Sequence, residues 1–332
     1  MPEPSWSEAM LSEEAGERAR ERMAGWLQAS GCVCGNVRMR WMGADRGWGG
    51  AACEAGLARG EILLAFPAGI LLDASAAHRS ALGPLLEKAA AAAAEAAATA
   101  AATGSAPAEE LPRKARRPAG PKLPDAWAII LLLLHERAKA ERSFWFPYID
   151  MLPKHFDNAL HFTGGEAELL VGTHLADALL RDANHDLAQL GETLEFMRGC
   201  DPAALPEGSC SVQALRWAHS VFWSRALVVP LDSNAQPKEQ NQALCPYLDL
   251  LNHSPRSPHR LSTFEAPAPS QNAPPEPEGA RGGACALAAG APSSRSARMV
   301  ALIAGADVAA DSEVVINYGR KSNEQLLLYG SV

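Results

Sequence analysis

The chain has 332 residues, of which 48% are hydrophobic, and it carries a formal net charge of -8 at pH 7. This length and composition can bury a sizeable core, as one large domain or two modest ones. The acidic balance opposes attraction to nucleic acid or anionic lipid, and the longest unbroken apolar stretch, Ala126 to Leu134, is too short to cross a bilayer. We therefore expect a globular protein that acts on a protein partner, without nucleic-acid or membrane partners; the oligomeric state stays unknown.

The seven cysteines include no C-x-x-C pair, which predicts a reducing compartment. The first 21 residues are acidic and lack the apolar core of a signal peptide. We expect a cytoplasmic protein, with the chloroplast as the alternative if the N-terminus is processed or incomplete. Cys32 and Cys34 lack a second pair of metal ligands, and the nine histidines show no H-E-x-x-H cluster, so no metal site is expected.

The N-terminal part of the chain predicts one helix and two strands. Residues from Glu8 to Ser30 mix charged and apolar side chains at helical spacing. Arg38 to Trp41 and Glu61 to Pro67 predict two short strands around a glycine-rich turn, Gly43 to Gly50.

The middle of the chain predicts helices, and two low-complexity stretches interrupt the pattern. The first, from Glu87 to Pro121, is alanine-rich and then basic, which predicts a frayed helix that leads into a loop. The second is rich in Pro, Ala, Gly and Ser and runs from about Ser254 to Arg298. Helices are predicted over 125–142, 166–198 and 211–225, and strands over 299–303 and 314–318.

Short strands at both ends of a helical middle indicate an α+β fold. The predicted divisions are an N-terminal helix with a lead-in strand (1–42), a first part of the main domain (43–86), a low-complexity insertion (87–121), a helical insert (122–225), and a second part of the main domain (226–332) that contains the loop 254–298.

The most informative motif is D-x-x-N-H, formed by Asp249, Asn252 and His253. An isolated Asn-His pair before Ser-Pro is more typical of a helix cap or a turn. Read together with Asn317 to Asn323 and with Tyr329-Gly330, however, the motif resembles the SET domains of the Rubisco large-subunit methyltransferase-like family.

Other matches follow in the family's order, from the G-x-G turn to the S-R pair that ends a helix. The matching stretches are Gly47-Trp48-Gly49, Ser80 to Leu85, the block Phe144 to Ile149 with Leu152-Pro153, and Ser224-Arg225. The resemblance implies a SET domain of short strands and small sheets with an inserted helical (iSET-like) region. In the relatives a C-terminal helical substrate-binding domain follows; here it is absent after Val332, so we expect either that the domain is lost or that the sequence is a fragment.

By this resemblance the cofactor is S-adenosylmethionine. Glycines let a backbone approach a ligand closely, and a guanidinium at Arg225 can pair with a carboxylate through two hydrogen bonds. The cofactor-binding residues implied are Gly47, Trp48, Gly49, Ala81, Leu82, Gly83, Arg225, Asp249, Asn252 and His253.

The resemblance makes Tyr318 the catalytic residue, with its hydroxyl near the amine that receives the methyl group. A lysine amine must lose its proton first, and burial beside a positive sulfonium lowers the amine pKa. Leu227, Leu248 and Tyr329 are expected to contact the substrate. Because an imidazole needs hydrogen-bond partners that two leucines cannot supply, a lysine of a non-histone protein is the expected target.

Two alternatives stay open within this fold: a catalytically weak SET-fold protein that acts as an interaction module, and a protein-histidine methyltransferase. A Ser/His/Asp hydrolase is disfavoured because the sequence has no G-x-S-x-G elbow.

Overall fold

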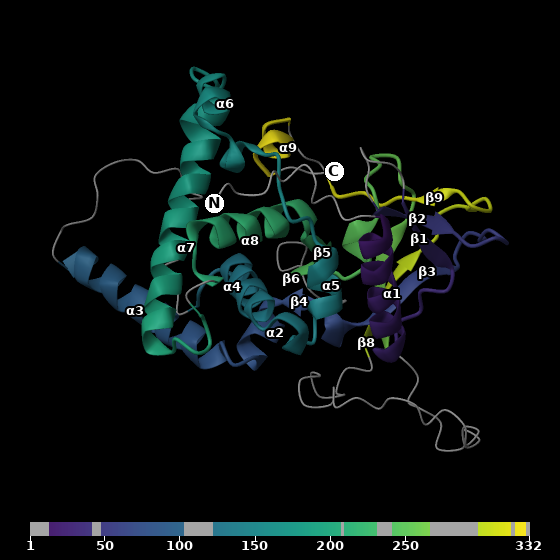
Figure 1. Ribbon diagram of the computed structural model, residues 1–332, viewed down its shortest axis with the longest axis horizontal. Coiled ribbons are helices and arrows are strands. Elements are labelled where there is room, and N and C mark those ends of the chain that lie inside the picture. Colours follow the sequence, from purple (N-terminus) through teal and green to yellow (C-terminus); the bar gives the residue numbers. More distant parts are fainter. Residues whose placement is uncertain are drawn as a thin grey trace, which may run out of the picture.

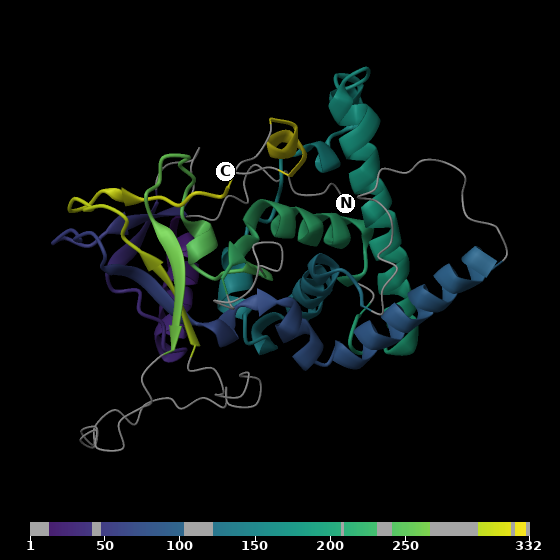
Figure 2. The ribbon, with the colours of Figure 1, turned by 180° about the vertical axis from the view of Figure 1, so that it is seen from behind.

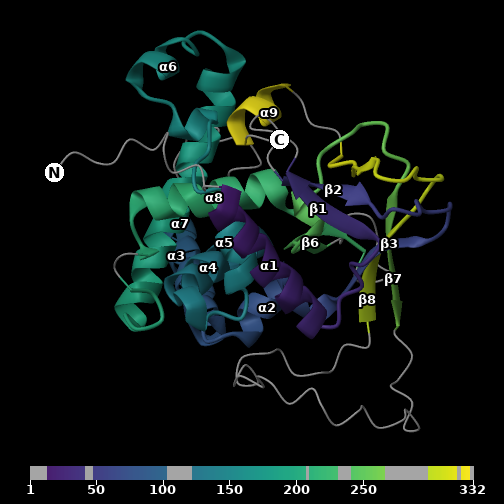
Figure 3. The same ribbon diagram turned by 45° about the vertical axis from the view of Figure 1, so that its right-hand side comes forward.

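The computed structural model describes residues 13–41, 48–102, 122–206, 209–230, 241–265, 298–319 and 323–329. Most helices gather on one side of the molecule and two small sheets on the other, with a third small sheet between them (Figure 1). The N-terminal helix α1 (Glu13–Ala29) runs along the border between the two parts (Figure 3) and packs against α5 (Phe146–Met151). This mixture of short antiparallel strands and helices confirms the predicted α+β class.

Each of the three sheets has three strands, and all described pairings within the sheets are antiparallel. The strand orders are β1-β2-β9, β3-β8-β7 and β4-β6-β5. Seen from behind, β7 lies on the side of the sheets opposite α1 (Figure 2). The strands are β1 (Val37–Trp41), β2 (Trp48–Ala52), β3 (Ile62–Pro67), β4 (Leu72–Asp73), β5 (Leu227–Val229), β6 (Asn241–Leu244), β7 (Arg260–Glu265), β8 (Arg298–Ile303) and β9 (Glu313–Val314).

The two strands predicted in the N-terminal part are confirmed, and the structure adds strand pairings that the sequence did not show. The predicted strands near 38–41 and 61–67 lie in different sheets: β1 pairs with β2, which forms partly within the glycine-rich turn, and β3 pairs with β8. The low-complexity loop expected over 254–298 also contains β7, which extends the β3–β8 sheet. The partner of β3 is distant in the sequence, so local composition did not reveal this pairing.

The helical part is inserted between β4 and β5. Its helices are α2 (Ala74–Arg79), α3 (Gly83–Ala102), α4 (Asp125–Ala138), α5, α6 (Gly164–Glu168), the π-helix η5 (Leu175–Leu180), α7 (Arg181–Cys200) and α8 (Val212–Arg225). The last helix, α9 (Asn323–Tyr329), follows the final strand. None of the described helices is long and apolar enough to cross a membrane.

The helix expected over 166–198 is divided into three pieces. Helix α6 begins with a capping box in which Glu166 bonds back to Thr163, but it ends after five residues. Gly172 then adopts a positive φ of 79°, which an α-helix does not allow, and η5 and α7 follow. By contrast, α8 has the expected bounds, because the Ser211 side chain accepts a hydrogen bond from the Ala214 amide as its N-cap.

Helix α4 forms the centre of the helical part. Every residue from Trp127 to Glu136 is buried, so this helix presents no solvated face over that stretch. It packs against α2 and against α8. Helix α4 therefore gives a fixed base to α8, whose last residue is Arg225.

Candidate active site

Two segments far apart in the sequence lie side by side at the centre of the candidate site. The Ile316 amide donates to the Asn252 carbonyl oxygen (2.9 Å), and the Ser254 amide donates to the Ile316 carbonyl oxygen (2.9 Å). His253 and Ile316 thus form a parallel bridge. The pairing brings the D-x-x-N-H motif to the strand that leads to Tyr318.

The side chains of Asn252 and His253 are held by this second segment. The Asn252 amide donates to Glu313 Oε1 at 2.7 Å. His253 Nδ1 accepts from the Tyr318 amide at 3.1 Å, and the two rings stack with centroids 5.0 Å apart. Because Nδ1 accepts, the ring proton of a neutral His253 lies on Nε2.

Arg225 and Asp249 present two buried polar atoms without a partner in the described structure. Arg225 Nη1 donates to the Asp249 carbonyl oxygen at 2.8 Å, whereas its Nε is buried and unpaired. The Asp249 side chain is nearly fully buried, and Oδ2 accepts a hydrogen bond from the Tyr148 hydroxyl. Oδ1 of the same carboxyl has no partner. An unpaired donor and an unpaired acceptor in one neighbourhood are a feature of a binding site, because a ligand can satisfy both.

The electrostatics of these groups are linked. Burial raises the pKa of Asp249 to about 6, and the Arg225 charge and the Tyr148 hydrogen bond limit that rise. Burial also raises the pKa of Tyr318 to about 12, with Arg225 and Asp249 close enough to act on it in opposite directions. Near neutral pH the site therefore holds a guanidinium, a mostly ionised carboxyl and a neutral phenol.

The hydroxyl of Tyr318 donates to the carbonyl oxygen of Leu251. Leu251 in turn packs against β2, because a Cβ added to Gly50 would lie only 2.2 Å from Leu251 Cδ2. Gly50 thus permits the close contact between β2 and the D-x-x-N-H segment.

The backbone immediately before Asp249 has an unusual conformation. Tyr247 has φ 74° and ψ -43°, which places it near the γ-turn region that L-residues rarely adopt. Its hydroxyl donates to the Val37 carbonyl oxygen at 2.6 Å, which ties the turn to β1. Strain of this kind costs roughly 1–3 kcal/mol and persists only where the surrounding structure fixes it, often at functional sites.

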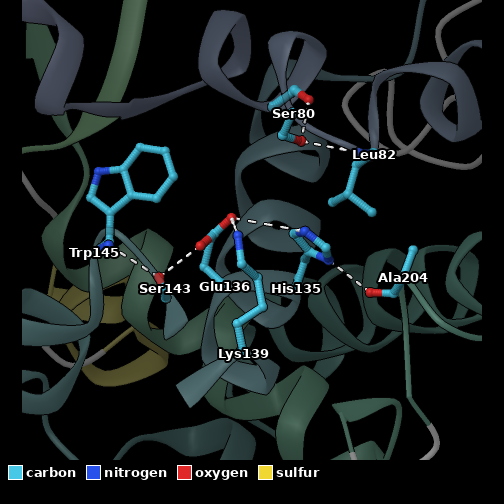
Figure 4. A network of polar contacts seen from close by, with 9 residues as sticks. Ser80, Leu82, His135, Glu136, Lys139, Ser143, Trp145 and Ala204 are labelled. Atoms are coloured by element: carbon cyan, nitrogen blue, oxygen red, sulfur yellow. Dashed lines mark hydrogen bonds and ion pairs between the residues drawn. The ribbon is translucent and has the colours of Figure 1, made fainter. Parts of the chain in front are cut away.

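A buried polar network fixes the segment that carries Tyr148 (Figure 4). The Glu136 carboxylate of α4 accepts from Ser143 Oγ (2.6 Å) and from Lys139 Nζ (2.8 Å). Ser143 Oγ accepts from the Trp145 amide, and the Trp145 indole donates to the Ile70 carbonyl oxygen. These bonds set the start of α5 and therefore the place of the Tyr148 hydroxyl.

Comparisons with known proteins show which proteins this chain is similar to. No family model matches the chain. The actin-histidine N-methyltransferase of Drosophila melanogaster is 30% identical over 141 residues, which span 37% of this chain and 26% of that protein. SET domain-containing protein 4 of Mus musculus is 26% identical over 216 residues, which span 62% and 41% of the two chains.

Among solved structures, the SET domain of LSMT bound to lysine and AdoHcy matches with a TM-score of 0.64 at 20% identity. The match covers 94% of this chain and 56% of that one. The chain has the SET-domain fold. It spans less than half the length of both curated relatives named above.

Within this SET fold, the residues predicted from the sequence fall into two groups. Those that the structure brings together are Arg225, Asp249, Asn252, His253 and Tyr318, joined by the contacts described above. Gly49 is buried in β2, the strand that packs on Leu251, whereas Gly47 lies outside the described residues.

For the turn that contains Ala81, Leu82 and Gly83, the described contacts show packing, and its role in cofactor binding stays a prediction. The turn joins α2 to α3, and α4 packs against both α2 and α8, whose end carries Arg225. Leu82 is fully buried in the main core. A Cβ at Gly83 would lie 2.1 Å from the His78 carbonyl oxygen. Packing therefore gives a reason for both residues that does not depend on a ligand.

Four other predicted contact residues have different surroundings. The Trp48 indole packs against α1, where a Cβ at Gly16 would lie 3.3 Å from it. Leu227 and Leu248 are buried in the main core, at 8% and 0% exposure. The Tyr329 backbone belongs to α9, and its side chain lies outside the described residues.

Tyr148 and Gly50 were not predicted from the sequence as parts of this site. Tyr148 lies in the apolar block 144–149, and a tyrosine buried in such a block needs a hydrogen-bond partner for its hydroxyl, which was the available signal. Within the described ranges, no group of three or more His, Cys, Asp or Glu side chains is placed to hold a metal ion.

Proposed function

We propose that this chain is an S-adenosylmethionine-dependent protein methyltransferase. The observation that carries the proposal is the convergence of Arg225, Asp249 and Tyr318, with Arg225 Nε and Asp249 Oδ1 buried and unpaired. The methionine part of the cofactor carries a carboxylate and an ammonium group. Arg225 Nε is a donor for the first and Asp249 Oδ1 is an acceptor for the second, so the residues present fit the group.

When bound, S-adenosylmethionine supplies a methyl group on a positively charged sulfur. Arg225 binds and orients the cofactor, and the stacked His253 and Tyr318 rings give the site a fixed wall. The hydroxyl of Tyr318, anchored on the Leu251 carbonyl, stays protonated at neutral pH because burial raises its pKa to about 12. The neutral hydroxyl orients, through a hydrogen bond, the nitrogen that receives the methyl group. It does not remove a proton from that nitrogen.

We propose lysine of a non-histone protein as the target. The similar solved SET domain holds lysine, and the positions of Leu227 and Leu248 supply no hydrogen-bonding side chain for an imidazole. The similarity to an actin-histidine methyltransferase favours histidine as the second candidate.

Calorimetry tests the cofactor part of the proposal. The purified full chain should bind S-adenosylmethionine, and it should bind 5′-methylthioadenosine, which lacks the amino-acid part, at least about tenfold more weakly because Arg225 and Asp249 lose their partners. A protein that acts only as an interaction module should bind neither compound. Equal affinity for both compounds would also contradict the assignment of Arg225.

Mass spectrometry tests the target. Cell lysate is incubated with the protein and isotopically labelled S-adenosylmethionine, and the labelled peptides are sequenced. Label on lysine supports the proposal, whereas label on histidine alone would replace lysine with the second candidate.

A further inference from the structure

Tyr148 belongs to the helical insert, but its hydroxyl reaches the candidate site. The side chain is fully buried on α5, and the hydroxyl donates to Oδ2 of Asp249, 101 residues later in the chain. It is the one described side chain that donates a hydrogen bond to the Asp249 carboxyl. The hydroxyl therefore determines which carboxyl oxygen is occupied and which is left available.

We propose that Tyr148 is a positioning residue: its hydroxyl fixes the Asp249 carboxylate so that the unpaired Oδ1 offers an acceptor to the bound molecule. The inference rests on the proposed function for the identity of that molecule. The geometry itself does not, since the hydrogen bond and the unpaired oxygen belong to this chain alone.

The buried Asp249 carboxylate depends on neighbouring protein groups for its charge. A carboxylate with no water around it is stable in its charged form only if protein groups compensate the lost solvation. Around Asp249 the Arg225 charge, the Tyr148 hydroxyl and a backbone hydrogen bond of Asp249 itself do so, and together they hold the pKa to about 6 against the effect of burial. Without the hydroxyl, Oδ2 loses its side-chain donor, and the ionised form becomes less favourable.

The other titratable groups that face Asp249 do not change their protonation state over the pH range in which Asp249 titrates. They are Tyr148 itself on α5, Arg225 on α8, Cys245 after β6 and Tyr318 after β9. Burial raises the pKa of Cys245 and of both tyrosines, so these three groups stay neutral, and the guanidinium is cationic. A titration between about pH 5 and about pH 8 in this cluster therefore reports Asp249.

The first test measures the Asp249 carboxyl directly. In protein labelled with ¹³C at aspartate carboxyls, the Asp249 signal is identified by its loss in Asp249→Asn and is titrated in the wild type, in Tyr148→Phe and in Tyr247→Phe. We expect the Asp249 pKa to rise by about one unit in Tyr148→Phe, the size of a hydrogen bond to a charged group. It should not move in Tyr247→Phe, which also removes a buried hydroxyl, but one bonded to Val37.

The second test measures turnover against pH. The ratio of kcat/KM in Tyr148→Phe to that in the wild type should be low near pH 6 and should recover as the pH rises and Asp249 ionises again. A loss of packing alone would reduce the ratio equally at every pH. An Asp249 pKa in folded Tyr148→Phe equal to that of the wild type would overturn the inference, as would a ratio independent of pH.

A second route remains if Tyr148→Phe does not fold. Replacement of the four tyrosines with 3-fluorotyrosine makes the phenol a stronger donor, so the Asp249 pKa should fall, and an unchanged pKa would again overturn the inference. The carboxyl titration needs neither cofactor nor turnover. Failure of the wild type to bind S-adenosylmethionine would instead count against the proposed function.

Discussion

The hydroxyl of Tyr318 donates a hydrogen bond to the carbonyl oxygen of Leu251, which lies 67 residues earlier in the chain. This bond ties the last strand of the domain to the D-x-x-N-H segment at the candidate site. Together with the stacking of His253 on the same ring, this bond fixes the orientation of the phenol.

Tyr318→Phe removes this hydroxyl and leaves the ring that stacks on His253. We expect the variant to bind S-adenosylmethionine with unchanged affinity and to lose about 100-fold in kcat, a typical effect when one oriented hydrogen-bonding group is removed from a transition state. Calorimetry and a methyl-transfer assay on the same preparation separate the two quantities. Full activity in the variant would remove Tyr318 from the role assigned to it.

Arg225→Lys keeps a positive charge but loses the planar donor group and the buried Nε. The affinity for S-adenosylmethionine should fall by about tenfold, because an ammonium cannot form two parallel hydrogen bonds to a carboxylate. The affinity for 5′-methylthioadenosine, which has no carboxylate, should stay as in the wild type. An equal decrease for both compounds would indicate general damage to the site and no specific role for the guanidinium.

Local sequence patterns predicted the elements with strong local signals. Ser211 caps α8 where expected, and the S-R pair at its end places Arg225 at the site. The patterns could not give the pairing of residues 252–254 with Ile316 or the contact of Gly50 with Leu251, because both depend on chain segments that meet only in the fold.

The same limit applies to the turn at 81–83, whose residues were assigned to the cofactor from the sequence. A glycine after a buried leucine fits either a close approach to a ligand or a close approach to backbone, and the sequence does not distinguish the two. The structure accounts for Gly83 by the second, since its α-carbon faces the His78 carbonyl oxygen.

Gly83→Ala tests this reading of the turn. The new methyl group would meet backbone at 2.1 Å, so we expect a loss of about 3 kcal/mol in the free energy of unfolding. The folded fraction should bind S-adenosylmethionine as the wild type does. Gly165→Ala is the matched control, because an added Cβ there meets nothing within 4 Å and alanine is the better helix former. Weaker cofactor binding in folded Gly83→Ala would instead support a cofactor-binding role for this turn.

Asp249→Asn should change the pH dependence of stability. Burial raises the pKa of Asp249 from 3.8 to about 6, so the folded state binds this proton more tightly than the unfolded chain. The wild type therefore loses stability as the pH rises from about 4 to about 6, whereas an asparagine does not titrate. We expect the stability of the variant relative to the wild type to increase by about 2 kcal/mol between about pH 4 and about pH 7, measured by urea unfolding. Asp157→Asn, which removes an exposed carboxylate, should show no such change, and a constant difference for Asp249→Asn would mean that this carboxyl titrates normally in the fold.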